Sequence, residues 1–196
     1  MQIEIRADGL RIHGYVNVTG KKSRPVITPH GKCIEVIEER AFERAIQKSG
    51  DISVTVDHED GHIYASTKDG TLKLYEDSIG LHADVIITDE NLIQIAKMGK
   101  IKGWSFGMYN VVDELEQRAD EIPIRHVKDL MLDHLTLVVK KKPFYAATSV
   151  EVRAGDEVDI ENRAFENEVT VVDISAPSKS YYLNYENRIA SLKIVQ

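Results

Sequence analysis

The sequence has little of several features that would assign it to a common class of protein. It has a single cysteine, Cys33, so no disulfide can form within the chain, which fits a reducing compartment. No apolar run approaches the roughly 20 residues that a membrane-spanning helix needs, and the N-terminal stretch lacks the apolar core of a signal peptide. The net charge of -7 argues against the basic stripe typical of nucleic-acid binders. We therefore expect a soluble, intracellular protein that binds neither membrane nor nucleic acid.

The chain does contain enough apolar sequence for one sizeable core. Hydrophobic residues make up 42% of its 196 residues, and many lie in short alternating runs that predict strands. One pair of runs, within Gln2 to Val18, is joined at Asp8-Gly9, a typical hairpin turn. The segments Glu38 to Lys48 and Glu90 to Met98 have the spacing of helices. Because most connections are too short for parallel crossovers, we predict a mainly antiparallel α+β fold, a closed or partly closed β-barrel with surrounding helices.

The composition changes after Lys140-Lys141-Lys142-Pro143. Residues 151–196 contain nine acidic and five basic residues. Their net charge of -4 is more than half of the net charge of the chain, which is -7. Val169 to Ile174 predicts a strand and Tyr181 to Val195 an amphipathic helix. We expect a main domain over residues 1–152 and an acidic appendage over residues 153–196 that docks on the main domain or on a partner.

One stretch, Gly103-Trp104-Ser105-Phe106-Gly107, suggests a nucleophilic serine at a constrained position in the chain. The pattern Gly-x-Ser-x-Gly also occurs in α/β-hydrolases, where a strand precedes the serine and a helix follows it. Here a predicted helix precedes the motif and a predicted strand follows it, so the context argues against that fold. Such a motif by itself is only a hypothesis, and the rest of the chain has to supply a base.

Two histidine positions could complete a catalytic group, because a nucleophilic serine needs a base and the base needs an orienting partner. His58 follows a predicted strand, Asp51 to Asp57, and is either that base or an ordinary loop histidine. His62 is a competitor in a polar turn. Asp133 and His134 lie in the apolar run from Val127 to Val139, where side chains alternate, so only one of them should face the site. A structural histidine with a satisfied hydrogen bond is the alternative reading of His134.

Between Ile12 and about Val152 the chain resembles the prohead, or capsid-maturation, proteases of tailed bacteriophages, which are similar in fold to the herpesvirus assembly proteases. The segments that carry the resemblance occur in the order of the family. They are His13-Gly14-Tyr15-Val16, Ile37 to Ile46, Val54-Thr55-Val56-Asp57-His58, Leu72 to Leu81, Ile101 to Met108, Leu132 to Val138 and Pro143-Phe144-Tyr145-Ala146-Ala147.

The resemblance implies that Ser105 is the nucleophile and His58 the general base. Phage members commonly have an acidic residue at the position of His134, so this chain departs from their pattern and resembles the Ser-His-His arrangement of the herpesvirus enzymes. We expect His134 as the third member, with Asp133 as the fallback. Main-chain N–H groups near the serine, around Gly103 and Gly107, and a cation such as Lys141 or Lys142 are candidates for stabilising the oxyanion.

The function implied by the resemblance is a serine endopeptidase that acts in the host cytoplasm, inside the assembling procapsid. Its expected substrates are the scaffolding protein or the scaffold-like region of the capsid protein, and the protease itself is a further candidate. We expect no cofactor and no metal, since the histidines lack the spacing of metal ligands. A homo-oligomer is left open. The alternatives are a catalytically silent capsid-assembly module on the same fold and an unrelated β-rich binding domain.

Overall fold

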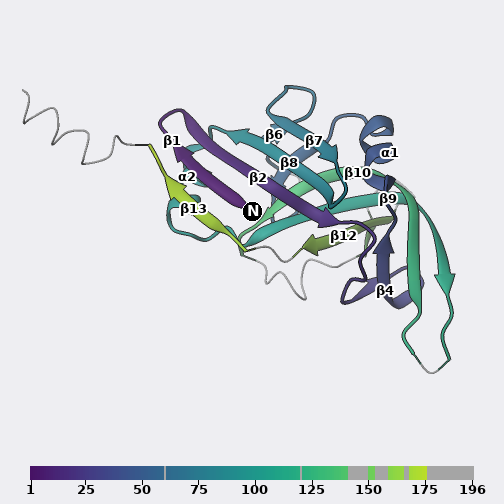
Figure 1. The fold of residues 1–196 in the computed structure, drawn as a ribbon. Coiled ribbons are helices and arrows are strands. Elements are labelled where there is room, and N and C mark those ends of the chain that lie inside the picture. Colours follow the sequence, from purple (N-terminus) through teal and green to yellow (C-terminus); the bar gives the residue numbers. More distant parts are fainter. Residues whose placement is uncertain (60, 120, 141–149, 153–158, 166–167, 176–196) are drawn as a thin grey trace, which may run out of the picture.

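The computed structural model describes residues 1–59, 61–119, 121–140, 150–152, 159–165 and 168–175 (Figure 1). Its helices are α1 (Ala41–Lys48) and α2 (Glu90–Lys97). Its strands are β1 (Gln2–Arg6), β2 (Gly9–Val18), β3 (Pro25–Thr28), β4 (Gly31–Ile37), β5 (Ser53–Val56), β6 (Ala65–Ser66), β7 (Leu72–Glu76), β8 (Gly80–Ile87), β9 (Gly103–Glu116), β10 (Ile124–Val138), β11 (Val150–Val152), β12 (Asp159–Phe165) and β13 (Thr170–Asp173).

The described strands form two sheets, and most neighbours are antiparallel. The first sheet has the order β13-β1-β2-β8-β7, and the second runs β11-β12-β9-β10-β4-β3, with β5 paired to β10 and β6 paired to β5. Only β1 with β13 and β10 with β4 and β5 pair in parallel among the described strands. The α+β, mainly antiparallel fold is therefore confirmed. The described pairings leave two open sheets, so closure into a barrel stays a prediction.

Local sequence signals agree with several elements. The hairpin at Asp8-Gly9 joins β1 to β2, with Arg6 opposite Gly9. Asp89 caps α2, because its side chain accepts a hydrogen bond from the N–H of Leu92 at 2.8 Å. Residues 61–64 lie outside the strands, and β9 continues into the charged stretch that starts at Glu114.

The hydrophobic core lies between the two sheets and under the helices. On β9, Trp104, Phe106 and Met108 are fully buried members of this core. The ring of Phe42 from α1 packs edge-on against Phe106, with centroids 5.4 Å apart. Since side chains alternate along a strand, this arrangement turns Ser105 to the opposite face of the sheet.

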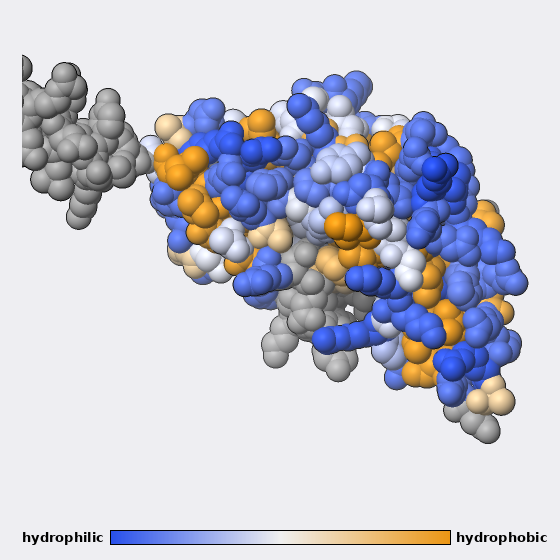
Figure 2. Space-filling view, in the orientation of Figure 1, coloured by the Kyte–Doolittle hydropathy of each residue, from blue (hydrophilic) through white to orange (hydrophobic). Residues whose placement is uncertain are grey.

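The surface is mostly hydrophilic on the face that Figure 2 shows, and hydrophobic side chains gather near β13. There Val171, Val172 and Ile174 are exposed. No helix in the described part of the chain has the length and apolar character needed to span a bilayer.

Candidate active site

Ser105 lies in the first half of β9, between β10 and β12. Its position in the ladder is opposite Thr136 on β10 and opposite Ala164 on β12. The serine is fully buried, with 0% of its surface exposed. The alternation that buries Trp104 and Phe106 in the core thus presents the serine hydroxyl on the other face, where the remaining site residues meet it.

His58 reaches this face from the end of β5. The strand runs parallel to β10, and directly after it Asp57 and His58 both have positive φ, 52° and 60°. Left-handed conformations are unfavourable for residues other than glycine, and three hydrogen bonds stabilise this bend. The carboxylate of Asp57 accepts hydrogen bonds from the N–H groups of Val139 and Lys140, and the N–H of His58 donates to Thr136 Oγ1 at 3.0 Å.

Four side chains form one continuous hydrogen-bonded chain. His58 Nε2 is 2.9 Å from Ser105 Oγ, and His58 Nδ1 is 2.7 Å from His134 Nε2. His134 Nδ1 is in turn 2.6 Å from a carboxylate oxygen of Asp133. A carboxylate only accepts, so His134 donates from Nδ1 and leaves Nε2 as an acceptor for His58. This assignment makes His58 Nε2 the acceptor that faces the serine hydroxyl.

Asp133 and His134 both take part, although alternation along a regular strand predicts that only one can. The register between β9 and β10 shifts between Leu132 and His134, where the ladder is irregular. Such a bulge re-aims the side chains beside it. His134 and Asp133 are mostly buried, with 6% and 15% of their side-chain surfaces exposed. The fallback residue of the sequence analysis therefore lies behind His134 rather than in its place.

The geometry agrees with the comparison to known families. A sequence model of the caudovirus prohead serine proteases matches residues 1–163 of the chain. The chain belongs to this family. Neither the curated proteins nor the solved structures contain a significant match. Membership of the family makes the chain a serine protease of bacteriophage capsid maturation at the level of the family, and the match extends as far as Arg163, inside β12.

The remaining residues expected at the site of this protease have different positions. Gly107 adjoins the side chain of His134, because a Cβ there would come within 2.7 Å of His134 Cε1. Gly103 begins β9, and a Cβ there would lie 3.3 Å from the carbonyl oxygen of Phe165. His62 is apart from the chain of four, against Tyr64 and 3.9 Å from Asp89. The oxyanion candidates Lys141 and Lys142 lie outside the described residues.

No metal centre is formed by the described residues, where no three His, Cys, Asp or Glu side chains group as ligands would. Thr136 is the residue of β10 that the sequence analysis missed. Its hydroxyl accepts from the N–H of His58 and contacts Thr55 Oγ1 at 3.1 Å. Its only sequence signal is that it shares a strand face with His134.

The second feature missed from the sequence is β12, which came from the stretch assigned to the acidic appendage. It pairs antiparallel with β9 from Phe165 opposite Trp104 to Glu161 opposite Met108. Ser105 Oγ donates a hydrogen bond to the carbonyl oxygen of Arg163 at 2.9 Å. The strand therefore lies beside the serine and contacts it, and Figure 1 shows the strand alongside β9.

A buried cluster of charges lies on the other face of β12. Arg163 contacts Glu35 at 2.8 Å and Glu161 at 2.5 Å, and Arg125 contacts Glu161 at 2.5 Å and Glu35 at 3.1 Å. Asp113 adds a further contact to Arg125. Burial alone lowers the pKa of the Arg163 guanidinium, but the charges and hydrogen bonds of Glu35 and Glu161 outweigh it and raise that pKa above its ordinary value.

Proposed function

We propose that the chain is the serine endopeptidase of capsid maturation in its virus, and that Ser105 is its nucleophile. The observation that carries this proposal is the unbroken series of contacts from Ser105 through His58 and His134 to Asp133. A nucleophile, a base and a group that orients the base are the three parts that acyl transfer to a serine requires.

The proposed reaction gives each member of the series a defined role. Ser105 Oγ attacks the scissile carbonyl carbon while His58 Nε2 takes the hydroxyl proton. His58 then gives that proton to the leaving amine as the C–N bond breaks, and a water molecule hydrolyses the acyl-enzyme by the same route. His134 accepts the hydrogen bond from His58 Nδ1, and the carboxylate of Asp133 fixes the tautomer of His134 and favours positive charge beside it.

The expected substrates are the scaffolding protein or the scaffold-like region of the capsid protein, reached inside the assembling procapsid. This choice comes from the family, whose name refers to the prohead. A homo-oligomer, and the absence of membrane and nucleic-acid binding, stay predictions. Self-cleavage and a docking role for residues 153–196 stay predictions.

The experiment is to combine the chain with the capsid and scaffolding proteins of the same virus under assembly conditions. Mass spectrometry should find defined cleavage products with the wild-type chain and none with Ser105→Ala. Circular dichroism of both chains controls for folding. Equal cleavage by the Ser105→Ala chain would show that the proposal is wrong.

The second candidate is a catalytically silent assembly module on the same fold. A third position without a carboxylate first suggested it, and Asp133 behind His134 weakens that argument. The burial of Ser105 beside β12 favours the silent module, because a serine that no substrate can reach does not react. The two candidates differ in whether Ser105 can ever be labelled by a serine-directed reagent.

A further inference from the structure

The chain lays one of its own strands over the serine that the proposed function uses. β12 follows β9 in an antiparallel ladder of five residue pairs, centred on Arg163 opposite Phe106, and Ala164 lies directly opposite Ser105. An extended peptide bound at this edge of β9 would need the same main-chain groups, since a sheet edge binds one strand at a time. The edge beside the nucleophile is thus already occupied in this structure.

The contact to Arg163 also directs the serine proton away from the base. A serine hydroxyl has one hydrogen to donate. Ser105 Oγ lies 2.9 Å from His58 Nε2 and 2.9 Å from the Arg163 carbonyl oxygen, so it can give its hydrogen to only one of them. When the hydrogen points to the carbonyl, His58 cannot take it, and the hydroxyl is not activated for attack.

The same contact makes β12 an unproductive substrate. Attack requires the serine oxygen to approach a carbonyl carbon while the carbonyl oxygen faces hydrogen-bond donors. Here the Arg163 carbonyl points its oxygen, the acceptor, at Ser105 Oγ. The carbonyl of Arg163 is therefore turned the wrong way for attack by Ser105.

β12 is anchored from its opposite face. Directly opposed residues of two strands share a face, so Arg163 and Phe165 point away from the side of Ser105 and Ala164. There Arg163 is 3% exposed and binds Glu35 through two nitrogens, at 2.8 and 2.9 Å.

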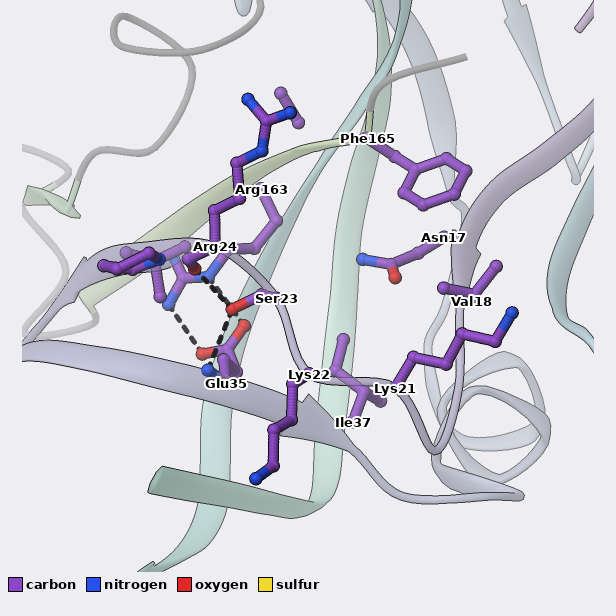
Figure 3. A pocket seen from close by; sticks show the side chains of 13 residues that line it. Asn17, Val18, Lys21, Lys22, Ser23, Arg24, Glu35, Ile37, Arg163 and Phe165 are labelled. Carbon is purple, nitrogen blue, oxygen red and sulfur yellow. Dashed lines mark hydrogen bonds and ion pairs between the residues drawn. The ribbon is translucent and has the colours of Figure 1, made fainter. Parts of the chain in front are cut away.

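A cavity of about 290 Å³ lies beside this anchor, and Figure 3 shows Glu35, Arg163 and Phe165 among the side chains that line it. The basic loop that includes Lys21, Lys22 and Arg24 borders the same cavity. The anchor of β12 therefore lies next to an opening in the surface, away from the catalytic face.

We propose that β12 is an internal pseudosubstrate strand that keeps the protease latent until the strand leaves the edge of β9. The proposal rests on the proposed function of Ser105. In this proposal the ion pairs of Arg163 set the equilibrium between two states of the chain. In one state β12 is paired with β9, and in the other β12 has left the edge of β9. Displacement of β12 exposes Ser105 and lets its hydroxyl donate a hydrogen bond to His58 Nε2. It also frees the edge of β9 for an extended peptide.

The test is the rate at which an alkyl fluorophosphonate labels Ser105 in the full-length chain. In that reaction Ser105 Oγ bonds to phosphorus, fluoride leaves, and the proton passes to His58. The variant Arg163→Ala should be labelled at least about a hundredfold faster than wild type, since loss of one partner of a buried ion pair shifts an equilibrium by this order. Arg11→Ala is the control for loss of an arginine ion pair elsewhere, because Arg11 pairs with Asp84 at 2.6 Å in the other sheet.

Hydrogen exchange of the β12 amides, read on the same samples, separates the outcomes. Fast exchange together with fast labelling of Arg163→Ala supports the proposal. Wild-type labelling as fast as that of Arg163→Ala would overturn latency and leave the proposed function standing. Fast exchange of β12 without any labelling would overturn the proposed function, and latency with it.

A second measurement does not depend on the stability of one variant. Arg163→Lys keeps the positive charge but loses the two-nitrogen contact, so its labelling rate should fall between those of wild type and Arg163→Ala. A synthetic peptide with the sequence of residues 159–165 should slow the labelling of either variant, and a scrambled peptide should not. Cleavage of the peptide after its arginine, or no slowing at all, would contradict an unproductive pseudosubstrate.

Discussion

Asp133 is the residue whose replacement tests the geometry of the site most sharply. Its carboxylate lies 2.6 Å from His134 Nδ1, and His134 Nε2 lies 2.7 Å from His58 Nδ1. We expect its effect on the reaction to pass through His134. Asp133→Ala removes the acceptor that holds the Nδ1–H tautomer, and His134 Nε2 is then no longer fixed as an acceptor for His58.

The size of the effect follows from the kind of hydrogen bond that is lost. A hydrogen bond to a charged group contributes about 1.5–3 kcal/mol, which corresponds to about tenfold to 150-fold in rate if it acts fully in the transition state. With side-chain exposures of 6% and 15% for His134 and Asp133, little of this is screened by water. Asp133→Asn can still accept from Nδ1–H without the charge, so its loss should be smaller.

The assay is the labelling rate of Ser105 and the kcat/KM for a peptide substrate, measured in the Arg163→Ala background. Nitrogen-15 spectra of His134 should show the Nδ1–H tautomer with Asp133 present and a mixture in Asp133→Ala. The control is Asp129→Ala on the same strand, whose carboxylate pairs with Lys48 instead. If folded Asp133→Ala reacted within twofold of its parent, the reasoning about the tautomer would be refuted.

Three further changes probe other parts of the structure. Gly107→Ala would place a Cβ 2.7 Å from His134 Cε1, and the displaced ring should lower kcat by about a hundredfold while the fold survives. Thr136→Val removes the acceptor for the N–H of His58 and should lower both activity and the free energy of unfolding, the latter by about 1–3 kcal/mol in urea titrations. Burial, and then the charge of a neighbouring histidine, lower the pKa of His82. The unfolded chain therefore takes up this proton more readily than the folded one, so the free energy of unfolding falls as the pH drops below the ordinary pKa of histidine. The melting temperature should drop between about pH 7 and pH 5, and it should drop less in His82→Gln.

Each of these changes has a control or a contrary result. Gly50→Ala meets no atom within 4 Å and should leave kcat unchanged. Thr28→Val removes a similar pair of contacts, to the N–H of His30 and the carbonyl of Gly31, and should cost stability without a separate loss of activity per folded molecule. Wild-type activity in Gly107→Ala, or equal pH profiles of melting for wild type and His82→Gln, would contradict the respective argument.

Sequence patterns were a good guide where one strong local signal decides the structure. The positions of Ser105, His58 and His134 followed from motif order and the resemblance, and the structure places these three side chains in hydrogen-bonding contact. The hairpin at Asp8-Gly9 followed from local chemistry. In each case the residues that determine the feature are close together in the sequence, or belong to a known motif.

Other features depended on pairings that no local pattern contains. The bulge near Leu132 allows both Asp133 and His134 to contribute, which strict alternation excludes. The acidic composition around Glu161 and Arg163 predicted an appendage separate from the main domain, and both side chains are buried as partners in one ion cluster. A charged residue is predicted to be exposed unless its partner is known. The partner of Arg163 is Glu35, which is far away in the sequence.

The central claim is that Ser105 is a nucleophile that His58 activates. The most direct measurement is peptide mapping by mass spectrometry after fluorophosphonate treatment of the Arg163→Ala chain. We predict one adduct, on Ser105, that is absent in Ser105→Ala and forms far more slowly when His58→Ala is added. An adduct on another residue, or labelling that continues undiminished without His58, would contradict the account.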